Sequence, residues 1–76
     1  MSDVEFCLSI ARVLLPNLEK AAVFVNYALA ETVDQRLRFL LQPVLDAIER
    51  KDAEATARWL DRAISYEQSR RARGNP

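Results

Sequence analysis

The amino-acid sequence indicates an all-α protein, a small bundle of three to four helices built from helical hairpins. Apolar residues recur at helical spacing along almost the whole chain, while strand signals are nearly absent. The 76 residues include one Gly, and neither Asn-Gly nor Asp-Gly occurs, the dipeptides typical of tight β-hairpin turns. Residues suited to capping a helix also precede the apolar stretches, so each expected helix has a local start signal.

The length of the chain suggests that the bundle is completed by homodimerisation. A chain this short buries only about 60% of its unfolded surface, so a disulfide, a metal or a second copy usually adds stability. A single Cys excludes an intramolecular disulfide, and with no His there is no set of structural zinc ligands. Because half of the residues are apolar, we expect a homodimer. The expected single domain covers residues 1–71, with a frayed polar tail at 72–76.

Three capping signals fix where the helices are expected to start. Ser2 with Glu5, and Thr32 with Gln35, have the spacing of a capping box. Asp52 follows two cations that suit the end of the preceding helix, and is itself a good N-cap. The expected helices therefore cover residues 3–15, 17–30, 33–50 and 53–71.

Two prolines bear on this division. Pro16 disfavours helix at the residue before it, so we expect the first two helices to be separate. The alternative is one kinked rod, because the apolar face of the first helix continues in phase across Pro16. Pro43 lies inside the third helix and should kink it or break one backbone hydrogen bond.

A surplus of apolar residues on the first helix predicts the dimer interface. Phe6, Ile10 and Val13 form a second apolar stripe beside the one expected to face the core. Phe24 joins this stripe if the helix continues through Pro16. An apolar stripe of this kind on a small protein has to be covered by another helix, a second subunit or a partner. The predicted dimer interface is Phe6, Ile10, Val13 and Phe24.

Aromatic and arginine residues of the third and fourth helices predict a partner surface. Phe39 falls among polar residues of its helix, and Trp59 and Tyr66 share a shoulder of the fourth helix with two arginines. Trp, Tyr and Arg are enriched in interface hot spots. The alternative is that Trp59 closes the edge of the core and the arginines cover its face. The predicted partner-binding residues are Phe39, Trp59, Arg62, Tyr66 and Arg70.

The sequence has few residues of the kinds that act in catalysis or bind metals, so we expect no catalytic, cofactor-binding or metal site. No phosphate-binding loop, G-x-S-x-G, C-x-x-C or H-E-x-x-H motif is present, and Cys7 lies on the core stripe. The N-terminal residues do not resemble a signal peptide, and no apolar run is long enough to span a bilayer. We therefore expect a cytoplasmic protein without a membrane partner.

These observations favour a non-catalytic regulator or adaptor, of the inhibitor, anti-activator or chaperone type, that sequesters or blocks a partner protein. Small helical proteins of this sort are common among bacterial and phage regulators. One alternative is a nucleic-acid-binding regulator that uses the Arg-rich fourth helix and tail, although the net charge is zero and the pI about 6.2. Another is a structural subunit of a larger assembly. The arginines of the first alternative are Arg58, Arg62, Arg70, Arg71 and Arg73.

Overall fold

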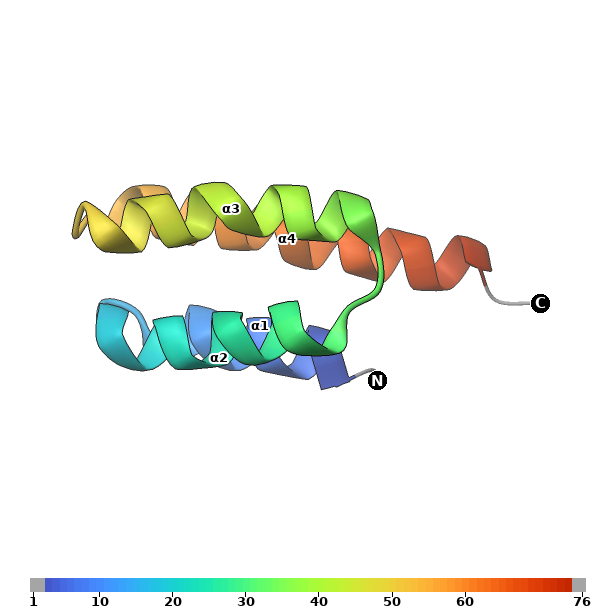
Figure 1. The fold of residues 1–76 in the computed structure, drawn as a ribbon, viewed down its shortest axis with the longest axis horizontal. Coiled ribbons are helices and arrows are strands. Elements are labelled where there is room, and N and C mark those ends of the chain that lie inside the picture. The colour runs from blue at the N-terminus through green and yellow to red at the C-terminus, as the bar shows by residue number, and fades with distance from the viewer. Residues whose placement is uncertain (1–2, 75–76) are drawn as a thin grey trace.

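The computed structural model describes residues 3–74 and consists of four helices joined by short turns (Figure 1). No strand occurs within residues 3–74, so the predicted all-α class is confirmed. None of the described helices combines the length and the apolarity that a membrane crossing requires. The helices are α1 (Asp3–Leu14), α2 (Leu18–Glu31), α3 (Gln35–Glu49) and α4 (Ala53–Gly74).

The helices form two antiparallel hairpins that pack against each other. In Figure 1 the α1–α2 hairpin lies below the α3–α4 hairpin, and successive helices alternate in direction along the 40 Å long axis. α1 contacts α4, and α2 contacts α3, so each helix has two close neighbours. This arrangement buries one side of each helix and leaves the opposite side outside the bundle.

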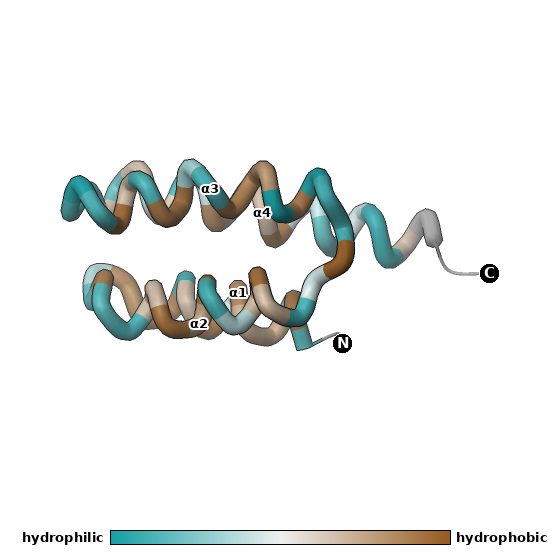
Figure 2. Tube along the Cα trace, viewed as in Figure 1, coloured by the Kyte–Doolittle hydropathy of each residue, from teal (hydrophilic) through white to brown (hydrophobic). Residues whose placement is uncertain are grey.

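The core lies between the hairpins and is built from small and branched apolar residues. Buried alanines in all four helices let the backbones approach closely, because interaxial distance depends on the side chains at the contact. Figure 2 shows that hydrophobic residues are more frequent in α1 and α2 than in α4, whose last turns are largely hydrophilic. The buried cluster consists of Val4, Leu8, Ala11, Ala21, Val25, Ala28, Leu37, Leu41, Val44, Leu60 and Ala63.

The first two helices are separate, as expected, and the single-rod alternative is wrong. α1 ends at Leu14 and α2 begins at Leu18 after a reversal of the chain. Asn17 is the N-cap of α2, where its side-chain oxygen accepts a hydrogen bond from the Lys20 backbone N–H at 3.1 Å. The reversal folds α2 back onto α1, so the two helices do not share one continuous apolar stripe.

The predicted capping box of Thr32 and Gln35 is wrong. Asp34 caps α3 instead, and its Oδ1 accepts a hydrogen bond from the Leu37 N–H at 3.0 Å. Thr32 ends α2, and its hydroxyl oxygen accepts a hydrogen bond from the Asp34 N–H at 3.2 Å. The Thr32 side chain therefore supports the turn, and a stronger N-cap residue two positions later starts the helix.

The turn between α3 and α4 confirms the Asp52 cap. Its Oδ1 accepts a hydrogen bond from the Ala55 N–H at 3.0 Å. Before it, the Asp52 N–H donates to the Ala47 carbonyl at 2.9 Å and the Lys51 N–H donates to the Ile48 carbonyl at 3.0 Å. This pair of bonds is a Schellman motif, and it places Lys51 in the left-handed region with φ of 59°.

Three further predictions concern Pro43 inside α3 and the two ends of the chain. α3 includes Pro43 and continues to Glu49, although Pro43 has no N–H to donate to the preceding turn. α4 ends at Gly74, beyond its predicted end at residue 71, and the rest of the predicted tail lies outside the described residues. Ser2, the predicted first cap, also lies outside them.

The left-handed Lys51 generates a stability prediction. A left-handed conformation costs an L-residue roughly 1–2 kcal/mol, and Gly avoids most of this penalty but loses more entropy on folding. We expect Lys51→Gly to raise the free energy of unfolding by about 1 kcal/mol, measured as a higher midpoint in urea. Lys51→Ala removes the same charge but keeps the Cβ, and serves as the control. Equal midpoints for the two variants would contradict the prediction.

Candidate interaction surfaces

Large apolar side chains are exposed on the outer side of the α1–α2 hairpin. Phe6 is 53% exposed and Val13 81% exposed on α1, while Val23 is 50% and Tyr27 57% exposed on α2. Within each pair the spacing of seven or four residues puts both side chains on one helix face, opposite the buried stripe. We refer to the two pairs together, Phe6 with Val13 and Val23 with Tyr27, as the α1–α2 face.

Of the four predicted dimer residues, two are exposed on the surface and two are half-buried. Phe6 and Val13 belong to the α1–α2 face, and Ile10 is half-buried. Phe24 is also half-buried and packs against the core, with its ring edge-to-face to Tyr27 at a centroid distance of 6.0 Å. The predicted interface omits Val23 and Tyr27, because it continues the apolar stripe of α1 in phase through Pro16. A helical wheel of residues 18–31 taken alone would place both opposite the buried Ala21, Val25 and Ala28.

A second candidate surface surrounds Trp59 on α4. Trp59 is half-buried and packs against the core, and the guanidinium of Arg62 lies 5.1 Å from the centroid of its ring. This is the geometry of a cation–π contact. Trp59 and Arg62, together with Ala55 and Arg58, line a shallow hollow, which we call the Trp59 hollow.

Phe39 lies on α3 and belongs to a different hollow. It is 75% exposed, and Gln35, Arg38 and Gln42 line the surface around it. Arg38 is anchored there, because its Nη1 donates to the Leu29 carbonyl at 2.8 Å. Phe39 therefore shares the α3–α4 hairpin with the other predicted partner residues, but not one hollow with Trp59.

Tyr66 and Arg70 take part in a polar cluster that joins α4 to the α2–α3 turn. The Tyr66 hydroxyl lies 2.9 and 3.0 Å from the two carboxylate oxygens of Asp34. Arg70 donates to both oxygens of Glu67, at 3.0 and 2.8 Å, and its Nε lies 3.5 Å from Asp34. Glu67 is fully buried. Both predicted partner residues thus have contacts within the chain.

Two more polar contacts join α4 to α1. The Glu5 carboxylate accepts hydrogen bonds from Gln68 at 3.2 Å and from Arg71 at 2.8 Å. Arg12 pairs with Asp61 at 2.9 Å farther along the same helices. Two of the arginines that favour the nucleic-acid alternative, Arg70 and Arg71, are therefore paired with carboxylates of this chain. The side chain of Arg73 lies outside the described part.

These contacts shift the pKa values of the groups involved. The Leu37 N–H lowers the pKa of Asp34 most; burial opposes this effect, and the Tyr66 hydroxyl and the Arg70 charge lower the pKa further. Hydrogen bonds from Gln68 and Arg71 lower the pKa of Glu5. Burial, together with Asp34, raises the pKa of Tyr66. The carboxylates are thus stabilised in their charged forms.

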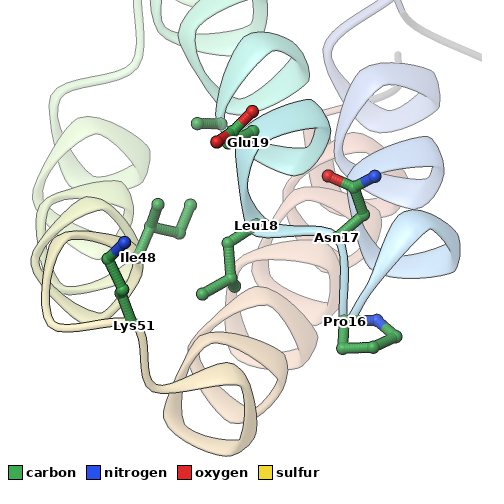
Figure 3. A pocket seen from close by; sticks show the side chains of 7 residues that line it. Pro16, Asn17, Leu18, Glu19, Ile48 and Lys51 are labelled. Atoms are coloured by element: carbon green, nitrogen blue, oxygen red, sulfur yellow. The ribbon is translucent and has the colours of Figure 1, made fainter.

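A wider groove lies at the end of the bundle where the α1–α2 and α3–α4 turns meet. Figure 3 shows Leu18 and Ile48 on opposite sides of the groove, with Lys51 beside Ile48 and Glu19 on the α2 side. Its lining mixes apolar and charged side chains. Within residues 3–74, no group of three or more His, Cys, Asp or Glu side chains is placed to hold a metal ion.

Cys7, the single cysteine, is a free thiol on α1. It is half-buried and packs against the core, as expected from its place on the apolar stripe. Burial raises the pKa of the thiol, and the charges of Asp3 and Glu31 raise it further. A raised pKa keeps the thiol protonated and lowers its reactivity.

Comparison with models of known protein families found no match, and comparisons with curated proteins and with solved structures found no significant match.

The polar contacts of α4 predict a stability that depends on pH. A carboxylate whose pKa is lower in the folded state contributes stability above its unfolded pKa and loses it as the pH falls through the folded value. For Asp34 and Glu5, whose ordinary values are 3.8 and 4.5, the loss begins near these values and continues at lower pH. We expect the urea midpoint to fall over this range.

A variant separates Asp34 from the other carboxylates. Asp34→Asn removes the charge, so it should lower the urea midpoint at neutral pH. The urea midpoint of this variant should also fall less steeply as the pH is lowered. Glu54→Gln is the control, because the Glu54 side chain is 85% exposed and its ion pair with Arg58, at 3.7 Å, is screened by solvent. If the urea midpoint of Asp34→Asn falls with decreasing pH as steeply as that of the wild type, the cluster does not stabilise the fold.

Proposed function

We propose that this chain is a non-catalytic regulator or adaptor that sequesters or blocks a partner protein and acts as a homodimer. The α1–α2 face carries the proposal. Four large apolar side chains, each at least half exposed, lie on one hairpin of a 76-residue chain. Exposed apolar patches on a small domain mark sites of protein–protein contact, because water contact with them is unfavourable.

A second copy of the chain is the proposed occupant of the α1–α2 face. The four residues carry no charge, so they add no like-charge repulsion of their own where two copies related by a twofold axis meet. The α3–α4 hairpin would then point outward from the dimer, leaving Phe39 and the Trp59 hollow to the partner. We also propose a cytoplasmic setting, where the Cys7 thiol would stay reduced.

The homodimer generates a prediction about mass in solution. Phe6→Glu places a charge on the α1–α2 face, and burying two such charges across a twofold axis is strongly unfavourable. We expect light scattering to give twice 8.7 kDa for the wild type and 8.7 kDa for Phe6→Glu at the same concentration.

Val33→Glu is the matched control for this experiment. Val33 is 94% exposed, but it lies in the α2–α3 turn and outside the α1–α2 face. The same change of charge there should leave the dimer mass unchanged. A monomeric wild type, or a dimeric Phe6→Glu, would contradict the assignment of the interface.

Partner binding is tested by capture from the lysate of the source organism with tagged protein, before and after nuclease treatment. We expect one protein to be captured in stoichiometric amount both before and after nuclease treatment. Phe39→Ala should reduce its yield without loss of helicity, because the Phe39 side chain is 75% exposed and supports little of the core. Capture that disappears with nuclease, or no capture at all, would contradict the proposed function.

A further inference from the structure

We propose that the Trp59 hollow binds an acidic segment of the partner protein, whose carboxylates pair with Arg58 and Arg62 and whose apolar side chain rests against the indole. This inference rests on the proposed function, since it names the chemistry of the partner. It follows from the charges that α4 leaves uncommitted, from the support beneath Trp59, and from the shape of the surrounding surface.

Three arginines of the bundle are already neutralised by carboxylates of this chain. Arg12, Arg70 and Arg71 each lie within 3.0 Å of a carboxylate on this chain. Arg58 differs, because its nearest acid, Glu54, is 3.7 Å away and both side chains are at least 75% exposed. Solvent screens such a pair, and it contributes little. The Arg58 guanidinium can therefore exchange Glu54 for a carboxylate of a partner at small cost.

Arg62 is the second uncommitted cation. It is exposed, and its guanidinium lies over the Trp59 ring instead of against a carboxylate of the described residues. Stacking on the ring restricts the side chain while leaving N–H donors of the planar fork available at its edge. Arg58 and Arg62 are four residues apart, so both project from one helix face. Together they offer two adjacent carboxylate-binding groups.

Trp59 supplies the aromatic surface of the hollow. The core holds one side of the side chain in place, so the indole is positioned before any partner arrives. Ala55, one turn before Trp59, has a small side chain and leaves the hollow open beside the ring. A rigid aromatic surface next to Arg side chains is the composition of an interface hot spot. An apolar side chain of the partner would add contact with the ring.

The pattern of charges along α4 favours an acidic protein segment over a nucleic acid. A nucleic-acid site needs a continuous row of cations along the phosphate backbone. Here the two uncommitted guanidiniums are followed on α4 by Arg70 and Arg71, which are already paired, and Glu54 lies next to Arg58. The site is therefore short and matches a few carboxylates close together.

The test uses the fluorescence of Trp59, the single tryptophan of the chain. A helical peptide of sixteen or so residues, made of Glu, Leu and Ala, is titrated into the wild-type protein. We expect a saturable change in emission that weakens as salt is added. The double variant Arg58→Gln/Arg62→Gln should bind at least about tenfold more weakly, because it loses two charge-assisted contacts. Lys20→Gln, an exposed cation on the other hairpin, is the control and should bind as the wild type.

Three results would overturn the inference: no change in emission with the Glu peptide, equal binding by the double variant, or equal binding of a peptide with Lys in place of Glu. Tighter binding of a single-stranded oligothymidylate would assign the hollow to nucleic acid instead. Both side chains that change are exposed, and circular dichroism of the double variant verifies that the helices remain.

Capture from lysate separates this inference from the function on which it rests. If the wild type captures a protein after nuclease treatment and the double variant captures it equally, the acidic segment is refuted and the proposed function stands. If the wild type captures no protein although the Glu peptide binds, the proposed function fails and the specificity of the hollow stands.

Discussion

The packing of the two hairpins against each other determines what remains on the surface. The bundle measures 19 by 18 Å across its axis, and each helix contacts two neighbours. Such a cross-section holds one buried stripe from each helix. Half of the residues are apolar, which is more than this narrow core accommodates, so large side chains such as Phe6 and Tyr27 remain outside. The apolar outer face of the first hairpin is thus a consequence of composition and bundle width together.

Polar contacts hold the helices in alignment, and α4 contributes to several of them beside the Arg38–Leu29 hydrogen bond between α3 and α2. Its residues pair with Glu5 and Arg12 on α1, and with Asp34 at the start of α3. A burial-driven interface alone tolerates small shifts along the helix axes, whereas paired charges hold one alignment. The side of α4 that faces α1 and the α2–α3 turn is thereby committed to the fold. Its remaining side, with the Trp59 hollow, makes none of these contacts.

The parts of the fold that depend on near neighbours in sequence could be predicted. Asp52 was identified as a cap because the N–H groups it serves lie within three residues of it, and periodicity placed all four helices. Asp34 was missed because Thr32 offers the same local pattern, and only the turn geometry decides between them. The bonding of Tyr66 joins residues 32 apart, which no local pattern reports. The exposure of Val23 was not predicted, because its orientation depends on the chain reversal before Leu18 and not on the phase of α1.

The proposal that a second copy covers the α1–α2 face is tested most directly by NMR on a mixture of isotope-labelled and unlabelled chains. In such a sample, filtered nuclear Overhauser effects arise only between different molecules. We expect them to connect the Phe6 and Val13 side chains with residues of the same hairpin on the partner copy. A sample in which no such effects occur, or in which they arise only from α3 and α4, would contradict the proposed arrangement.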